Sequence, residues 1–145
     1  MTKILGRFFA GVVMVGGIGL LGLPANAWAQ GSVTLEASAD TGSGPARSTY
    51  PQVIHVYNSG SGIATGVTVT FTPPKGVKIA GTCMVDHMAG GIRSYTCSLG
   101  DIAPLQTVDV SFILSTTKPG DDSFTADVTC IEGSSTSVFL PIVTT

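Results

Sequence analysis

The sequence predicts an all-β fold, a sandwich or barrel of about seven to eight short strands. After Gln30, apolar and polar residues alternate with a period of two in several segments. None of these segments has apolar residues at helical spacing over two turns. Clusters of Gly, Pro, Ser and Asn separate the segments at regular intervals. Valine and threonine dominate them, as suits a pleated, half-buried surface.

The N-terminus has the order of residues expected of a secretory signal peptide. Two basic residues precede the apolar, glycine-interrupted run Phe8–Leu23, and small residues follow it. The run is shorter than the roughly 20 residues that span a bilayer, which favours cleavage over a membrane anchor. Cuts after Ala27 or Ala29 satisfy the small-residue rule. We expect the cut after Ala29, with residues 1–29 as the signal peptide and 30–145 as a single domain.

The charge of the exported part excludes one class of function. Removing Lys3 and Arg7 from the seven basic residues leaves five against nine acidic ones, a formal charge of −4. The five are dispersed, so we expect no binding of nucleic acid through its phosphates. No second long apolar run follows, so we expect membrane contact only through the signal peptide before cleavage. The predicted location is secreted, periplasmic or at the cell surface.

The first half of the exported part contains four predicted strands. They cover about Val33–Ala37, Gln52–Asn58, Val67–Thr72 and Val77–Ala80. The turn-rich segment Asp40–Ser48 is a predicted loop between the first two. In the third strand Val67, Val69 and Phe71 alternate with threonines, and Pro73 ends the strand because proline cannot donate to a ladder.

The second half contains four more predicted strands. They cover about Ser94–Leu99, Val108–Leu114, Phe124–Cys130 and Ser137–Val143. The segment Asp86–Ile92 (DHMAGGI) is a predicted loop. Pro141 interrupts the last strand, which therefore belongs at a sheet edge.

The exported part contains three cysteines, Cys83, Cys97 and Cys130. An oxidising compartment favours a disulfide, and the odd count leaves one thiol over. Three pairings are possible. We favour Cys83–Cys97, because these residues lie in two extended segments that flank one Gly-rich loop. Cys130 alternates with the apolar residues of its strand, so we expect it in the core as a small hydrophobe; the alternative is an exposed thiol that links a partner.

Four segments together resemble a known family, and their order and spacing carry the resemblance. They are Val53–Gly60 (VIHVYNSG), Ala64–Val69 (ATGVTV), Pro74–Val77 (PKGV) and Cys97–Pro104 (CSLGDIAP). The chain from Tyr50 to Cys130 is similar to the bacterial surface-repeat domain catalogued as domain of unknown function eleven. The resemblance implies an immunoglobulin-like antiparallel β-sandwich and a role in cell-surface, adhesin-like proteins. The family occurs in tandem, and one copy fits here. The family usually has a glycine soon after its Leu-Gly-x-Leu element, whereas here Leu105 stands after Pro104.

A blue-copper site is the alternative with the clearest chemistry. His55, Cys83, His87 and Met88 supply two imidazoles, a thiolate and a thioether, the ligand types of such a site. The protein would then be a small exported electron-transfer protein. Met88 adjoins His87, however, which leaves little room for both on one metal. Cupredoxins also resemble one another in placing these ligands near the last strand. In addition, a disulfide with Cys97 would remove the thiolate of Cys83.

Other chemistry has less support. A zinc site from Cys83, His87 and Cys97 lacks a fourth ligand. Neither histidine lies in a nucleophile motif, and Asp121-Asp122 does not match the spacing of a calcium loop. Trp28 leaves with the signal peptide, which weakens sugar binding by stacking. We therefore expect no catalytic residue, no metal and no cofactor, and a partner that is another protein or a surface component.

An intact-mass measurement on the exported protein tests the leader and the cysteines together. After alkylation under denaturing conditions without reduction, we expect a chain that begins at Gln30 and carries one alkylated thiol, because the other two thiols are joined. Reduction before alkylation, as the control, should label all three cysteines. Three labels without reduction would exclude the disulfide, and a doubled mass would indicate a disulfide between chains.

Overall fold

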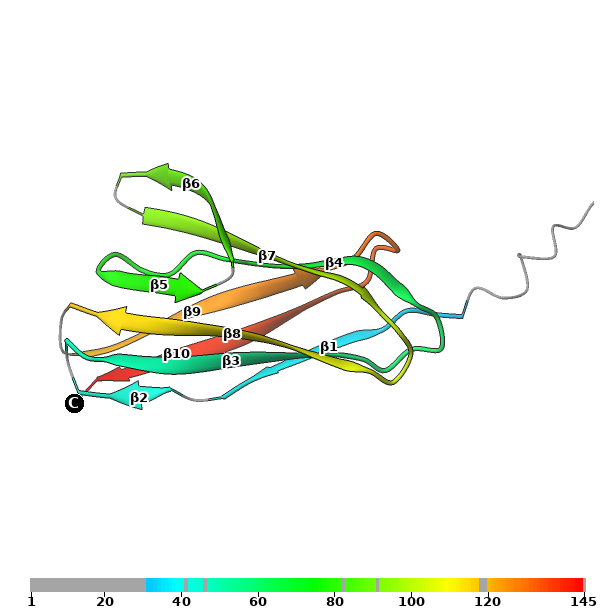
Figure 1. Cartoon of the computed structure of the whole chain (residues 1–145), viewed down its shortest axis with the longest axis horizontal. Coiled ribbons are helices and arrows are strands. Elements are labelled where there is room, and N and C mark those ends of the chain that lie inside the picture. The colour runs from blue at the N-terminus through cyan, green and yellow to red at the C-terminus, as the bar shows by residue number, and fades with distance from the viewer. Residues whose placement is uncertain are drawn as a thin grey trace, which may run out of the picture. The chain divides into compact units, whose positions relative to one another are not determined.

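A computed structural model of the chain describes residues 31–40, 42–45, 47–81, 83–90, 92–117 and 120–144. These residues form strands in two sheets that face each other as a sandwich (Figure 1). The described residues include no helix, and hence none that is long and apolar enough to cross a membrane. The predicted signal peptide, with Trp28, lies outside the described residues.

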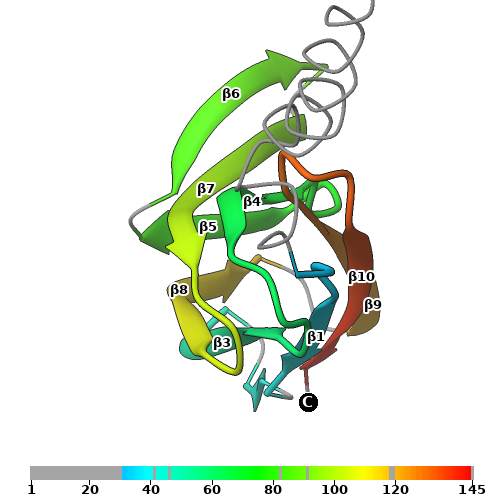
Figure 2. The ribbon, with the colours of Figure 1, turned by 90° about the vertical axis from the view of Figure 1, so that its right-hand side faces the viewer.

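The smaller sheet, sheet A, has four strands. In spatial order they are β1 (Leu35–Ala39), β3 (Thr49–Asn58), β8 (Thr107–Thr116) and β5 (Val77–Gly81). All their pairings are antiparallel. Viewed along the strands in Figure 2, β3 and β8 form the layer opposite β9 and β10.

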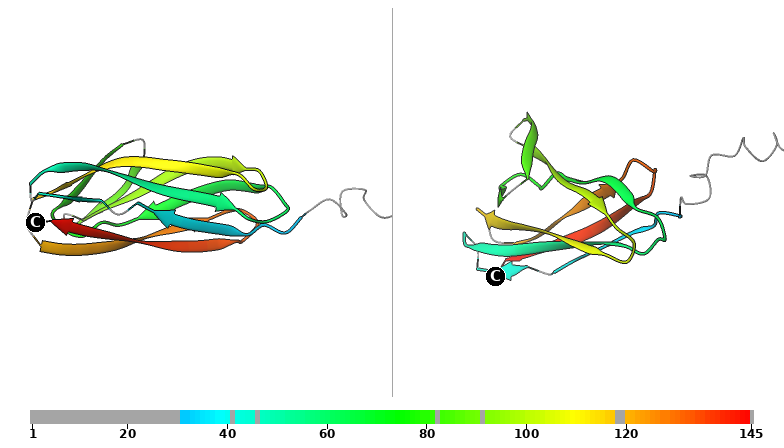
Figure 3. Two further views of the ribbon diagram at one scale, coloured as in Figure 1. Left: turned by 90° about the horizontal axis from the view of Figure 1, so that it is seen from below. Right: turned by 45° about the vertical axis from the view of Figure 1, so that its right-hand side comes forward.

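The larger sheet, sheet B, has six strands. In spatial order they are β2 (Ser43–Gly44), β10 (Ser135–Thr144), β9 (Gly120–Thr129), β4 (Ala64–Phe71), β7 (Ile92–Ile102) and β6 (Met84–Ala89). Only β2 pairs in parallel, with the last two residues of β10. The hairpin of β6 and β7, at one edge of sheet B, diverges from the rest of the sandwich (Figure 3).

The strand order is that of an immunoglobulin-like domain. β1, β3 and β8 correspond to strands A, B and E of that fold on one sheet, and β10, β9 and β4 correspond to G, F and C on the other. The chain therefore crosses between the sheets repeatedly, and the residues that alternate inward along both sheets meet in one core. The predicted sandwich class is confirmed.

The centre of the core is an aromatic cluster around Phe71. Its ring centroid lies 5.2 Å from that of Phe112, which comes from the opposite sheet. Tyr95 and Phe124, its neighbours in sheet B, lie at 5.7 and 5.8 Å. Aromatic pairs at these distances add about 0.5–1.5 kcal/mol each beyond the burial of their area. Phe71 thus joins the two sheets, as the alternation of the predicted strand requires.

Two predicted loops contain strands. The segment Asp86–Ile92 is mostly β6, which pairs with β7 from Met84 opposite Thr96 to Ala89 opposite Ile92. The prediction failed because this segment has no apolar alternation and its strand is defined by backbone pairing. The segment Asp40–Ser48 contains the two-residue β2, which is too short to show a pattern.

The disulfide agrees with the sequence, and the last strand agrees in part, because β10 is second from the edge of sheet B. Cys83, which follows β5, is bonded to Cys97 on β7, so the bridge spans the chain's passage from sheet A to sheet B. β2 is the only described strand beyond β10, and it pairs with Val143 and Thr144. Pro141 therefore has its ladder partner in β9 alone, as an edge position predicts.

Asn58, at the end of β3, is fully buried and makes hydrogen bonds with three segments. Its Nδ2 donates to the backbone oxygens of Gly62, at 2.8 Å, and Ile102, at 3.0 Å. Its Oδ1 accepts from the backbone nitrogen of Gly60 at 3.1 Å. Its own backbone nitrogen and oxygen bond to Gln106 and Leu105. This one residue therefore holds the loop after β3 and the loop after β7 together.

Replacing Asn58 tests this role. Asn58→Ala leaves two buried carbonyls and one amide without their partner, at about 1–3 kcal/mol for a group that finds no other. We expect the free energy of unfolding, measured by urea denaturation, to fall by about 3 kcal/mol. Ser59→Ala, one residue along, should change it by less than about 0.5 kcal/mol. A loss for Asn58→Ala as small as that of Ser59→Ala would contradict the role.

Candidate functional site

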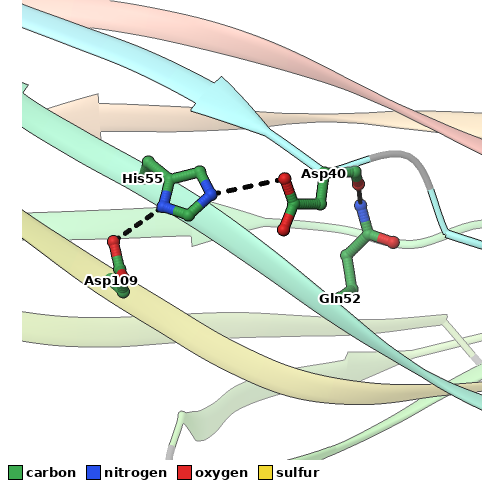
Figure 4. Close-up of polar contacts among 4 residues, drawn as sticks. All are labelled: Asp40, Gln52, His55 and Asp109. Carbon is green, nitrogen blue, oxygen red and sulfur yellow. Dashed lines mark hydrogen bonds and ion pairs between the residues drawn. The ribbon is translucent and has the colours of Figure 1, made fainter.

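The outer face of sheet A carries a histidine between two carboxylates (Figure 4). His55 lies on β3, out of phase with the buried Ile54 and Val56, as the sequence predicts. Its Nδ1 lies 2.7 Å from Oδ1 of Asp109, its neighbour on β8, and its Nε2 lies 3.4 Å from Oδ1 of Asp40, which follows β1. His55 therefore bridges three strands of the sheet.

The two carboxylates determine the ionisation of His55. The hydrogen bond to Asp109 is the largest cause that raises the pKa of His55 above 6.5; desolvation opposes it, and Asp40 adds to it. Beside the ring is a shallow hollow of about 270 Å³. It is lined by Glu36, Ala37, Ser38, His55, Tyr57 and Thr107. Because both ring nitrogens face carboxylates, His55 serves as a bridge between β3, β8 and the end of β1.

A second surface lies at the end of the sandwich opposite the C-terminus (Figure 1). We call it the loop end, and it consists of three loops, residues 59–63, 103–106 and 130–134. Asn58 bonds to the first two of them. The third bonds to Thr65 at the start of β4, where the backbone nitrogen of Ile131 donates to its carbonyl oxygen at 3.1 Å.

Two carboxylates fix the loop end further. Glu132 accepts hydrogen bonds from the side-chain hydroxyl of Thr65 and, at 2.9 Å, from its backbone nitrogen. These bonds lower the pKa of Glu132 to about 2, so its carboxylate is charged at neutral pH. Asp101 accepts from the backbone nitrogen of Gly66 at 2.9 Å. Gly66 has φ +57°, a backbone conformation that favours glycine, and Cδ1 of Ile131 lies 2.8 Å from the position that a Cβ would take there.

Each of the three loops presents one aliphatic side chain to solvent. The exposed fractions are 55% for Ile63, 70% for Leu105 and 79% for Ile131. Leu105 also has a positive φ of 60°, a backbone conformation that costs an L-residue about 1–2 kcal/mol. Single exposed aliphatic side chains are common. Here three of them lie on three loops at the same end of the sandwich, which also carries the carboxylates of Glu132 and Asp101.

The outer face of sheet B has different chemistry. We call it the hydroxyl face; its polar residues are Thr68, Thr70, Ser94, Thr96, Ser98, Thr125, Thr129, Ser135 and Ser137, with Asp127 among them. The exposed Phe139 lies on the same face, opposite Thr125. Neighbouring hydroxyls face each other across the strands, at 3.1 Å for Thr68 and Thr129. Ser137 donates to Asp127 at 2.6 Å.

The structure does not assemble the alternative copper site. The sulfur of Cys83 is bonded to Cys97 and is not available as a thiolate ligand. The side chains of His87 and Met88 lie outside the described part of the chain. Among the side chains that are described, no three of His, Cys, Asp or Glu lie close enough together to hold a metal ion.

Cys130 is half-buried rather than fully inside the core. It packs against the edge of the core, and its thiol donates to the backbone oxygen of Ser134 at 3.5 Å. Burial is the largest cause that raises the pKa of this thiol, which keeps it protonated and unreactive at neutral pH.

Sequence reasoning missed the loop end as a site. The positive φ that makes Leu105 unusual is visible only in the structure. Ile63 and Ile131 lie outside the alternating segments, so no periodicity marked them. Nothing in the sequence shows that these three residues share one end.

Comparisons with known proteins assign no family to this chain. No protein-family model and no curated protein matches the sequence. The surface-repeat resemblance therefore stays a prediction, while the immunoglobulin-like sandwich that it implies is what the structure shows.

Three solved structures illustrate the likeness. A CARDB domain from Pyrococcus furiosus has 12% sequence identity and a TM-score of 0.47, over 77% of this chain and 95% of that one. A non-cellulosomal cohesin from Archaeoglobus fulgidus has 11% identity and a TM-score of 0.45, over 77% and 92%. A PapD-like domain of human CEP192 has 15% identity and a TM-score of 0.47, over 79% and 87%. At these scores no property of those proteins transfers to this chain.

The His55 bridge makes a prediction about pH. Asp109→Asn removes the largest cause of the raised pKa of His55. That pKa, followed by NMR of the imidazole ring protons, should therefore fall toward 6.5. A raised folded pKa contributes stability below the unfolded pKa and loses it as pH rises through the folded pKa. Asp109→Asn should therefore destabilise the protein more at about pH 5.5 than at about pH 8.5. Asp127→Asn, on the other sheet, is the matched control; an unchanged His55 pKa in Asp109→Asn would refute the bridge.

Proposed function

We propose that this protein is an exported, non-catalytic immunoglobulin-like module that binds a protein or surface component through its loop end. The adhesin-like role implied by the family resemblance agrees with this proposal. So do the leader and the disulfide, because disulfides persist in oxidising compartments outside the cytoplasm. The single observation that carries the proposal is the strained, exposed Leu105.

Leu105 does not serve the stability of the fold. Its side chain is 70% exposed, so it contributes little to the core, and its φ of 60° favours glycine. Glycine would remove the strain of about 1–2 kcal/mol. Strain of this kind concentrates at ligand clamps and other functional sites. A role in contact with a partner accounts for an apolar side chain at this position.

The loop end is also rigid enough for binding. Hydrogen bonds of Asn58 and Glu132 connect its loops to the strands, and Asp101 on β7 accepts one from Gly66 on β4 beside them. Side chains already held in place lose less entropy on binding than those of free loops. Sandwich domains commonly use loops at one end of a rigid scaffold for recognition. The proposed surface therefore combines apolar contacts at the tips with fixed charges beside them.

Site-specific photo-crosslinking in the exporting cell tests this function. A photoreactive amino acid in place of Ile131 should give a covalent adduct with the partner. The same amino acid in place of Phe139 is the matched control, because Phe139 is 62% exposed but lies on β10, away from the three loops. An adduct at Phe139 and none at Ile131 would refute the loop end as the binding surface.

Leu105→Gly separates binding from folding in the same experiment. We expect it to weaken the Ile131 adduct while the free energy of unfolding rises by up to about 1 kcal/mol, since the relieved strain exceeds the entropic cost of glycine. Arg47→Gly relieves the other positive φ of a described non-glycine residue, 64°, and should leave the adduct unchanged. An adduct as strong in Leu105→Gly as in the wild type would contradict a role for Leu105.

A further inference from the structure

A small hollow lies at the end of the sandwich where β5 and β7 begin, opposite the loop end. We call it the far-end hollow. It has a volume of about 130 Å³ and is lined by Pro73, Pro74, Gly76, Val77, Lys78, Ile92 and Arg93. Its walls come from both sheets, because Lys78 lies on β5 and Arg93 on β7.

The lining of the far-end hollow is mixed, with apolar side chains beside two cations. Ile92 is 43% exposed, and the prolines beside it add apolar surface. Lys78 and Arg93 are exposed cations on this lining, and Lys75 lies in the turn between the prolines and β5. A volume of about 130 Å³ corresponds to roughly four water molecules, which is room for the tip of one side chain. The matching ligand has an apolar tip with a carboxylate next to it.

The loop end has that chemistry. Ile131 projects from the third loop with 79% of its surface exposed, and the next residue in the chain is Glu132. The carboxylate of Glu132 is held by Thr65, and that of Asp101 by Gly66, so both negative charges have fixed positions. The loop end and the far-end hollow, at opposite ends of the sandwich, are therefore complementary in charge and in apolar character.

We propose that the partner of the loop end is a second copy of this chain, whose far-end hollow receives Ile131 while Lys78 and Arg93 face Glu132 and Asp101. This inference rests on the proposed function, because it names the partner of the same surface. Both surfaces lie on one chain at opposite ends, so the contact joins copies head to tail.

A head-to-tail contact has consequences that a symmetric dimer lacks. It uses two different surfaces, so each copy can bind two others and association continues into rings or filaments. The contact includes exposed ion pairs, whose attraction acts over about 10 Å at 0.1 M salt and about 3 Å at 1 M. Self-association should therefore weaken as salt increases.

Two variants with one damaged end each test the proposal by sedimentation velocity on the exported protein. Lys78→Glu/Arg93→Glu reverses the charge at the far-end hollow. Leu105→Lys/Ile131→Lys replaces two apolar side chains of the loop end by cations and leaves Glu132 and Asp101 in place. We expect the wild type to self-associate within the range of protein concentrations tested, which extends to about 1 mM. Each variant alone should associate at least about tenfold more weakly.

A mixture of the two variants should associate again, because the intact loop end of one meets the intact far-end hollow of the other. Ser98→Glu/Thr125→Glu adds two charges to the hydroxyl face as the control and should behave like the wild type. If the far-end variant alone associates like the wild type, the loop end binds itself and the head-to-tail contact is wrong.

The crosslinking experiment distinguishes this inference from the function on which it rests. An Ile131 adduct with twice the mass of the chain supports both. An Ile131 adduct of another mass, together with a wild type that stays monomeric, overturns the second copy as partner and leaves the loop end as the binding surface. No adduct at Ile131 overturns both.

Discussion

The loop end depends on one buried amide. The side chain of Asn58 has a partner for both of its polar atoms, and these partners belong to the loop 59–63 and to the end of β7. Its backbone nitrogen and oxygen bond to the loop 103–106. A hydrophobic residue at this position would leave the backbone partners of the side chain unpaired inside the protein, and an aspartate would place a charge against two carbonyl oxygens. The sandwich is joined across its layers by Phe71 and its aromatic neighbours, but the arrangement of two of the three loops at one end follows from Asn58, and Thr65 holds the third.

The sequence predicted the parts of the fold in which side-chain alternation and backbone pairing agree. In β4, Val67, Val69 and Phe71 are buried and the threonines between them are outside, as the pattern requires. β6 was missed because it is held at the edge of sheet B by pairing with β7 alone. The candidate site was missed for a related reason. Its residues come from loops far apart in the sequence, and only the Greek-key crossings bring those loops to one end.

Stability and exposure oppose each other at the loop end. Leu105 holds a backbone conformation that glycine would adopt without strain, and Ile131 covers Gly66 while most of its own surface faces solvent. The buried polar network beneath them keeps the loops in place despite these costs. Rigidity from hydrogen bonds below and apolar surface above is the combination that makes binding by a small domain efficient.

The hydroxyl face gives the molecule a flank of another kind. Its serines and threonines hydrogen-bond to one another and to water, and Asp127 is the single charge among them. Two such flanks brought together would exchange hydrogen bonds to water for equivalent ones between proteins, with little net gain. Changes in pH or ionic strength alter this little, because the surface has so little charge. Two molecules that met along this flank would therefore have no single preferred alignment and could slide past one another.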